Sequence, residues 1–131
     1  MKDNWFSGSR IVLTGGFGFL GQAIQRVGSA RAATIIPTDV TAHPVSGEHL
    51  DVLSAESTVS AILEHRPDAI IHLAGISHIN ESQAEPFRAV DVNVLGTINV
   101  MRAAVKLKQE RLYPVHVVIA SSNHVYGSHP G

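Results

Sequence analysis

Short apolar runs and amphipathic stretches alternate along the whole chain. Five runs have the length and apolar character of strands, and they cover residues 11–13, 33–38, 49–52, 69–74 and 115–120. Between them, apolar residues recur at helical spacing after residues 19, 54 and 85, which predicts three helices. This alternation predicts an α/β fold, a doubly wound parallel sheet with right-handed crossovers and the strand order 3-2-1-4-5.

Single residues indicate where these elements begin and end. Ser54 is a good helix cap, Pro67 ends the helix that follows it, and Pro114 separates the long third helix from the last strand. The run at 69–74 is almost continuously apolar, which fits a strand buried on both faces, and the polar residues 76–85 predict a loop. From Pro86 a long helix is predicted, with apolar residues at helical spacing at Phe87, Val90, Val94, Ile98, Met101 and Val105.

The first strand runs directly into glycines at positions 15, 18 and 21. Gly15 lets the chain reverse at a backbone angle closed to other residues, Gly18 lets a ligand approach the main chain, and Gly21 lets the helix lie close to the strand. Free amides and the positive end of the helix dipole then face the turn, which suits an anion such as a pyrophosphate. A plain connector between a strand and a helix has the same spacing, so the glycines alone leave both interpretations open.

Asp39 favours the ligand-binding interpretation. It closes the second predicted strand and lies about 20 residues beyond the glycines, where a dinucleotide-binding unit places the acid that binds the adenosine ribose. The alternative is an acidic turn residue after Pro37. Ligands of such sheets bind outside the carboxyl ends of the strands, where the strand order reverses. The candidate residues at these ends are 15–19, Asp39, Asp51, Ala74, Gly75, Ser121 and Ser122.

Composition argues against several functional classes. The 131 residues suffice for one domain with a substantial core, and 44% of them are hydrophobic against 16% charged. The net charge of −1 and the lack of a Lys/Arg cluster argue against a nucleic-acid interface. No apolar run is long enough to span a membrane, and residues 1–9 do not have the layout of a signal peptide, so we expect a cytoplasmic protein that binds no membrane.

Metal and thiol chemistry are not expected. The chain contains no cysteine, which excludes disulfides, thiol catalysis and thiolate metal sites. Its 8 histidines include no pair at helical spacing and no His-Glu-x-x-His motif, so no metal site is predicted. His72 falls inside a strand and is expected to be a core or pocket-wall residue, whereas His78 is expected to lie in a loop near a substrate site.

Six motifs, in order along the chain, resemble those of the extended short-chain dehydrogenase/reductase family, the NAD-dependent epimerases and dehydratases. The motifs are the glycine segment 14–21, Asp39, the Asp-Val pair at 51–52, His-Leu-Ala-Gly at 72–75, and the segments 93–100 and 120–127. The resemblance extends from the first predicted strand to the last residues of the chain.

The resemblance implies NAD as the cofactor and assigns residues to it. Gly15, Gly18 and Gly21 would hold the pyrophosphate and Asp39 the adenosine ribose, while Asp51 would contact the adenine. The other cofactor neighbours implied by the resemblance are Phe19, Leu20, Val52, Leu73, Ala74, Gly75, Asn93 and Ser121.

The resemblance also implies two catalytic residues. Asn93 would bend the long helix and support a proton relay, and Ser122 would hydrogen-bond the substrate oxygen. From the residues alone, Asn93 is equally a polar residue facing solvent and Ser122 a cap at a strand end. Asn is nevertheless a poor interior helix former, so we expect a reason for its presence.

The chain departs from the family at the acid–base pair. Catalysis in the family needs a Tyr-x-x-x-Lys pair, whose tyrosine exchanges a proton while hydride moves at the carbon. The tyrosines here are Tyr113 and Tyr126, and four residues after them stand Val117 and Pro130. Residues 1–131 therefore resemble an incomplete NAD-binding Rossmann domain, the amino-terminal part of an enzyme. We expect this chain alone to be inactive and, because its fifth strand would leave an open sheet edge, to self-associate.

Two functions remain open. The first is an NAD-dependent oxidoreductase, epimerase or dehydratase that acts on a sugar or nucleotide sugar and is a homodimer in its full-length form. The second is a non-catalytic NAD-binding regulator or scaffold. Ser122 in the catalytic position favours the enzyme, since a pure binding module does not need it. In either case Asp39 predicts NAD rather than NADP, because a carboxylate repels a 2′-phosphate.

Overall fold

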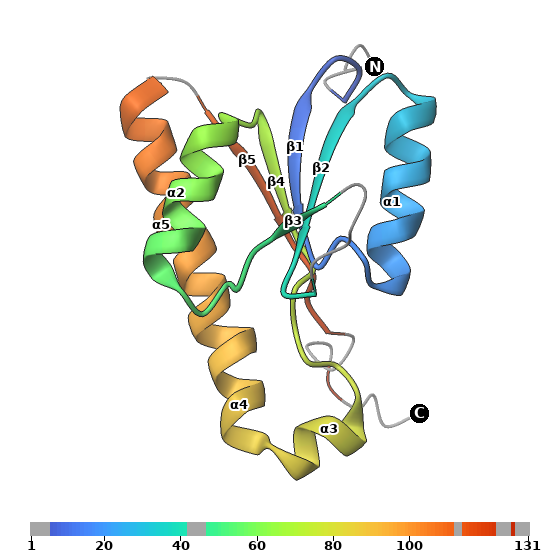
Figure 1. Ribbon diagram of the computed structural model, residues 1–131, viewed down its shortest axis with the longest axis vertical. Helices are drawn as coiled ribbons and strands as arrows, with labels where there is room; N and C mark the ends of the chain where they lie inside the picture. Colours follow the sequence, from blue (N-terminus) through green and yellow to red (C-terminus); the bar gives the residue numbers. More distant parts are fainter. Residues whose placement is uncertain (1–5, 42–46, 112–113, 123–126, 128–131) are drawn as a thin grey trace.

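The computed structural model describes residues 6–41, 47–111, 114–122 and 127. A five-stranded sheet runs through it in the order β3-β2-β1-β4-β5, and each neighbouring pair is parallel (Figure 1). The strands are β1 (Arg10–Thr14), β2 (Thr34–Asp39), β3 (Glu48–His49), β4 (Ala69–His72) and β5 (His116–Ile119). The predicted doubly wound α/β fold and its strand order are confirmed.

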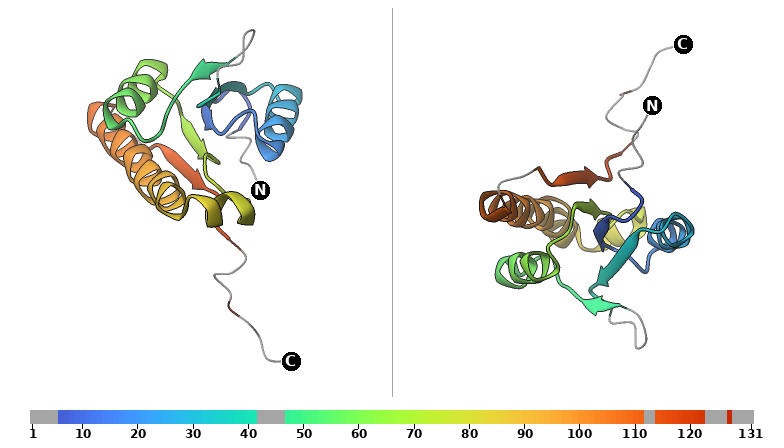
Figure 2. Two further views of the ribbon diagram at one scale, coloured as in Figure 1. Left: turned by 60° about the horizontal axis from the view of Figure 1, so that its bottom comes forward. Right: turned by 90° about the horizontal axis from the view of Figure 1, so that it is seen from above.

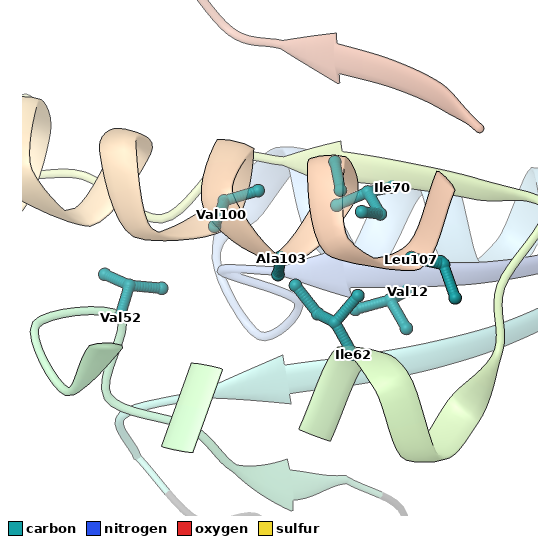
Figure 3. Close-up of a cluster of buried hydrophobic side chains, with 8 residues drawn as sticks. Val12, Val52, Ile62, Ile70, Val100, Ala103 and Leu107 are labelled. Atoms are coloured by element: carbon teal, nitrogen blue, oxygen red, sulfur yellow. The ribbon is translucent and has the colours of Figure 1, made fainter. Parts of the chain in front are cut away.

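Helices cover both faces of the sheet. Helix α1 (Phe19–Ala30) lies on one face, and α2 (Ala55–His65) and α5 (Gly96–Arg111) lie side by side on the other (Figure 2). Successive residues of a strand point to opposite faces, so the central residues 11–13 of β1, which are covered on both faces, are all apolar. Its Ile11 and Leu13 accordingly pack on the α1 side, whereas Val12 packs on the side of α2 and α5. The hydrophobic cluster on the side of α2 and α5, which contains Val12, is drawn in Figure 3.

Two predicted elements have different bounds. The third strand is limited to Glu48–His49 rather than 49–52, because the chain turns away after Leu50 donates a hydrogen bond to the Asp39 carbonyl. The predicted loop at 76–85 contains a short helix, α3 (Ile79–Ala84), so that prediction is wrong. Ser54 caps α2 as predicted, because its Oγ accepts a hydrogen bond from the Ser57 amide at 3.3 Å.

The long third helix is interrupted by one wide turn. Helix α4 (Pro86–Val90) leads into a π-helical turn, η1 (Asp91–Leu95), and α5 follows directly. In this turn the Gly96 amide donates to the Asp91 carbonyl, five residues back, as a π-turn requires. Asn93 is the central residue of η1. A bend at Asn93 was expected from the family resemblance, and the structure identifies its form as a π-turn.

The apolar stripe predicted for this helix faces away from the sheet. Phe87 is 85% exposed, and the other stripe residues are each exposed by more than two fifths of their surface. Small residues face the core instead: Ala89, Ala103 and Ala104 are buried, together with Val100 and Leu107 (Figure 3). Alanines allow the helix to lie close to the sheet and to α2. The helix is therefore apolar on two sides, and the side that carries the stripe is exposed.

Strand β5 forms one edge of the sheet, as predicted. It pairs with β4, and its Val118 and Ile119 are 49% and 40% exposed. In contrast, all four residues of β4 are buried, which confirms the expected strand covered on both faces. Within the described part of the chain, no helix is both long enough and apolar enough to cross a membrane.

Candidate cofactor site

The turn between β1 and α1 is packed too tightly for side chains at two of the three glycines that were predicted to hold the pyrophosphate. Gly15 has φ +68°, and a Cβ there would lie 2.7 Å from the Ala74 amide nitrogen on the neighbouring chain segment. At Gly21, a Cβ would lie 2.5 Å from the carbonyl oxygens of both Gly15 and Gly16. Both glycines are thus required by the fold itself, in agreement with the roles predicted for them.

Gly18 differs from these two, because the protein's own packing does not require a glycine there. Its φ of −67° suits any residue, and among the described residues an added Cβ would contact only the Gly15 oxygen, at 3.4 Å. The residue is exposed and stands at the N-cap of α1. A glycine at this exposed position leaves the main chain open to approach, and the ligand contact expected there from the sequence stays a prediction.

The amides that remain to bind an anion are those at the start of α1. Within the turn, the amides of residues 16, 17 and 18 already donate to Thr38, Asp39 and Gly15. The first turn of α1 contains no acidic residue and its N-cap makes no side-chain hydrogen bond, so the positive end of the helix dipole is not neutralised by the chain there. Phe19 and Leu20 flank this end and are 94% and 52% exposed.

Asp39 is bonded directly to the glycine turn. Its Oδ2 accepts a hydrogen bond from the Phe17 amide at 3.2 Å, and its Oδ1 accepts one from the Thr41 amide at 3.1 Å. The second bond is that of a turn acid, so the alternative interpretation describes part of the geometry. A carboxylate oxygen can accept more than one hydrogen bond, and Asp39 therefore keeps acceptor capacity on both oxygens beside the turn.

Two glutamines of α1 also hold the turn, and sequence reasoning missed them. Gln22 Nε2 donates to the Phe17 carbonyl at 2.9 Å, and Gln25 Nε2 donates to the Gly16 carbonyl at 2.7 Å. They tie down carbonyl oxygens that would otherwise repel an anion. Their only sequence signal was the presence of amide side chains in the first two turns of a helix that follows a glycine segment.

The segment after β3 is fixed by α5. Asp51 Oδ1 accepts from the Leu53 amide at 2.9 Å, and the buried Asn99 of α5 donates through Nδ2 to the Val52 and Leu53 carbonyls, at 2.9 and 3.3 Å. The side chain of Val52 lies in the hydrophobic core and is 5% exposed. Asp51, which is predicted to contact the adenine, thus presents its side chain at the strand end, whereas Val52, which is predicted to be a cofactor neighbour, has only its main chain there.

The segment that follows β4 lies against the glycine turn and is held by Asn93. Asn93 Oδ1 accepts from the Ile76 amide at 2.8 Å, and its Nδ2 donates to the Ile76 carbonyl at 3.0 Å. A Cβ at Gly75 would lie 2.9 Å from the same Oδ1. On the other side, the Leu73 amide donates to the Thr14 carbonyl at 3.1 Å, and the Leu73 side chain packs against the core. Leu73 and Ala74 therefore lie beside the glycine turn and Gly75 lies against Asn93, while the cofactor contacts expected of the three residues stay a prediction.

His72 is a satisfied core residue, as one of the two sequence interpretations held. It is 2% exposed, and its two ring nitrogens lie 2.6 Å from Thr14 Oγ1 and 3.0 Å from Thr97 Oγ1. Burial lowers the pKa of His72, which favours the neutral imidazole. His78 is the N-cap of α3 and is exposed.

Ser121 and Ser122 follow β5 at the same end of the sheet, and both are exposed. The Ala120 amide donates to the His72 carbonyl at 3.1 Å, which holds the chain beside β4 up to this point. The residues just after them, 123–126, lie outside the described part of the chain, and so does Tyr113. Among the described residues, no three His, Asp or Glu side chains are grouped so that they would hold a metal ion.

One end of the sheet therefore collects the residues predicted to bind the cofactor. It offers an unneutralised helix start, a glycine without a packing role, an anchored carboxylate at the end of β2 and the Ala74–Gly75 segment across the turn. In Figure 1 this is the end at which α1 begins and β4 leads into α3. An elongated ligand with a central anion and a sugar hydroxyl pair matches these features.

Comparisons with known proteins agree with this arrangement. The family model described as "NAD dependent epimerase/dehydratase family" matches residues 11–131. The chain is 32% identical to a dTDP-L-rhamnose 4-epimerase of Burkholderia thailandensis, over 92% of the chain and 36% of that protein. It is 27% identical to a dTDP-glucose 4,6-dehydratase of Escherichia coli, over 92% of the chain and 39% of that protein.

Solved structures give the same result for the fold. A UDP-glucose 4-epimerase of Thermus thermophilus in complex with NAD matches 75% of the chain and 34% of its own, with a TM-score of 0.68 and 27% identity. A uronate dehydrogenase of Agrobacterium tumefaciens matches 88% of the chain and 41% of its own, with a TM-score of 0.71 and 26% identity. The chain thus spans well under half the length of the relatives that it matches.

Proposed function

Since the chain belongs to the NAD-dependent epimerase/dehydratase family, we propose that it binds NAD at the carboxyl ends of β1, β2 and β4 and is the cofactor-binding part of a longer enzyme. When bound, NAD would accept hydride from a substrate carbon. As substrate we propose a sugar or nucleotide sugar, because nucleotide sugars are named for the epimerase and dehydratase relatives.

The observation that carries this proposal is the hydrogen bond between Asp39 and the Phe17 amide. It brings the acid at the end of β2 into direct contact with the glycine turn, 22 residues earlier in the chain. A plain connector has no need of an acid there. A dinucleotide needs both groups together, since its pyrophosphate and its adenosine ribose are adjacent.

Of the two residues proposed for catalysis, Asn93 and Ser122, the first has a defined set of contacts. Both functional atoms of the Asn93 amide are bonded to the Ile76 main chain. These bonds favour a positioning role for Asn93, whose side chain would hold the segment after β4 in place for the proton relay. The substrate would then be bound by other groups. Ser122, four residues before Tyr126, is proposed to hydrogen-bond the substrate oxygen.

Replacing Asp39 should weaken NAD binding and reduce the preference for NAD over NADP. A carboxylate that accepts from both ribose hydroxyls contributes about 1.5 to 3 kcal/mol, so Asp39→Ala is expected to raise the dissociation constant for NAD about 10- to 100-fold. The wild-type chain should bind NADP more weakly than NAD, since the carboxylate repels the 2′-phosphate. Calorimetric titration with both cofactors measures this. Glu110→Ala, which removes an exposed acid of α5, controls for net charge. Equal or tighter binding of NADP by the wild-type chain would rule out this role for Asp39.

Two further features belong to the proposal. One is a homodimer, for which the exposed stripe on α4, η1 and α5 is the surface we propose, because its large apolar side chains are not needed by the core. A second copy of the same stripe is a matching partner, since an isologous interface joins identical patches.

The second further feature of the proposal is a cytoplasmic location. Fractionation of cells that express the tagged protein would test it.

The double variant Ile98→Lys/Val105→Lys should be monomeric at concentrations where the wild-type chain is dimeric. Both side chains lie on the stripe, at 43% and 53% exposure, so charge there disrupts an apolar contact without entering the core. Sedimentation velocity measures the change. Lys108→Glu, an exposed substitution on α5 outside the stripe, should leave the dimer intact. A wild-type chain that stays monomeric at high concentration would contradict this use of the stripe.

A further inference from the structure

A series of hydrogen bonds through the side chains of Thr14, His72 and Thr97 links the glycine turn to the π-turn, and the buried His72 is at its centre. Thr14 is the last residue of β1, directly before Gly15, and it is buried. Thr97 is the second residue of α5, the helix that follows η1 directly. The His72 ring lies between them, with Nδ1 2.6 Å from Thr14 Oγ1 and Nε2 3.0 Å from Thr97 Oγ1.

The hydrogen bond at the Thr97 end fixes the direction of the bond to His72 Nε2. Thr97 Oγ1 donates to the Asn93 carbonyl at 2.7 Å, so its single proton is used and it accepts from His72 Nε2–H. Burial lowers the pKa of His72, which favours the neutral ring, and a neutral ring with its proton on Nε2 has Nδ1 as an acceptor. Thr14 Oγ1, which accepts from the Ala74 amide at 3.4 Å, then donates to His72 Nδ1.

Both ends of this chain of bonds belong to the cofactor site. Thr14 and Ala74 border Gly15, where an added Cβ would meet the Ala74 amide nitrogen at 2.7 Å. Asn93 lies at the other end and holds Ile76 through its side-chain amide. A neutral imidazole donates on one side and accepts on the other, so it bridges the two ends with no polar atom of the ring left unsatisfied. Buried polar networks fix geometry best when every member is hydrogen-bonded.

We propose that His72 is a positioning residue that sets the distance between the glycine turn and the π-turn carrying Asn93, so that cofactor affinity at the turn depends on Thr97 of α5. This inference rests on the proposed binding of NAD at the glycine turn. It assigns a role in the site to His72, which the sequence left open as a core or pocket-wall residue, and to Thr97, for which the sequence predicted no separate role. It also gives the π-turn a function, since the Asn93 carbonyl is the acceptor at the end of the chain of bonds.

The matched pair Thr97→Val and Thr97→Ser tests the proposal in the 131-residue chain. Valine keeps the shape and removes the hydroxyl, which leaves His72 Nε2–H without its acceptor, whereas serine keeps the hydroxyl. One lost hydrogen bond of ordinary strength corresponds to about a 2- to 10-fold change in an equilibrium constant. Thr97→Val is expected to raise the dissociation constant for NAD by that factor, and Thr97→Ser is expected to restore wild-type binding.

Nitrogen-15 spectra of the histidine rings test the proposed bond directions separately from NAD affinity. In the wild-type chain His72 should show a protonated Nε2 and an unprotonated Nδ1. In Thr97→Val this preference should be reduced, and in Thr97→Ser it should be kept. Protonation at Nδ1 in the wild-type chain would overturn the proposed bond directions and with them the proposal.

A second variant removes the dependence on how well Thr97→Val folds. In His72→Asn, the amide oxygen can replace Nδ1 as the acceptor from Thr14, but nothing reaches Thr97. This variant should weaken NAD binding as Thr97→Val does, and combining the two should add little, because one chain of bonds is broken in both. Fully additive effects, or unchanged affinity in folded Thr97→Val, would overturn the inference alone. A wild-type chain that does not bind NAD would instead overturn the proposed function.

Discussion

The Gly21→Ala chain is expected to be less stable than the wild-type chain by about 1 to 3 kcal/mol, the range found for overpacked interiors. The added Cβ would lie 2.5 Å from two main-chain carbonyl oxygens, those of Gly15 and Gly16, which cannot move unless the turn opens. NAD affinity should fall as well, since α1 would be pushed away from the turn. Urea unfolding measures the stability, and unchanged stability would contradict the observed packing.

Gly18→Ala is the matched comparison and should show the opposite combination. Its Cβ would contact only the Gly15 oxygen at 3.4 Å, so stability should change by no more than about 1 kcal/mol, the scale of an altered N-cap. The methyl group would, however, occupy the space through which a pyrophosphate approaches the main chain. The dissociation constant for NAD should therefore rise about tenfold or more. A Gly18→Ala chain that binds NAD like the wild type would contradict the ligand-based reason for this glycine.

The 131-residue chain is expected to bind NAD and yet to form no detectable NADH from sugars or nucleotide sugars. Oxidation of an alcohol carbon requires that the hydroxyl proton be removed by a base, and Ser122 is a very weak base at neutral pH. The sequence contains no Tyr-x-x-x-Lys pair. A missing general base alone lowers the rate about 100- to 10,000-fold.

A sensitive fluorescence assay for NADH over a panel of sugars and nucleotide sugars measures this prediction. A known sugar dehydrogenase, assayed at low concentration in the same plate, establishes the detection limit. Robust NADH formation by the chain would show that another residue, such as Tyr126 or His124, serves as the base. The acid–base role of the missing pair would then be wrong.

The strand order was predictable because it depends on few features. Apolar runs at residues 11–13 and 69–74 mark strands covered on both faces, and parallel strands joined by right-handed helical crossovers leave few arrangements. The glycine turn and Asp39 were predictable for a similar reason. In dinucleotide-binding units such a spacing reflects a ligand of fixed dimensions, and it is visible in the sequence without knowledge of the packing.

The direction of the long helix was not predictable from spacing. Periodicity shows which residues share a face, but α5 has two apolar faces, one with Ala103, Ala104 and Leu107 and one with Ile98 and Met101. The sheet and α2 are close to α5, so the face with alanines packs inward and the larger stripe remains exposed. Hydrophobicity alone would favour the larger side chains for the core.

The supporting residues of the site could not be found from the sequence either. Gln22, Gln25 and Asn99 act on main-chain carbonyls that are distant in sequence or in a different element, so their role depends on the tertiary fold. Helix α3 has six residues, too few for a periodic pattern. Val52 matched a family motif, yet its side chain packs in the core, because a motif position does not specify whether the side chain or the main chain is used.

Calorimetric titration of NAD into the wild-type chain tests the central claim most directly, with Asp39→Ala titrated in parallel. The account predicts saturable binding at one site per chain, weaker binding of NADP, and NAD binding that is about 10- to 100-fold weaker in Asp39→Ala. Circular dichroism on the same samples establishes that both chains are folded. A folded wild-type chain that does not bind NAD, or that binds it as well after Asp39 is replaced, would contradict the account.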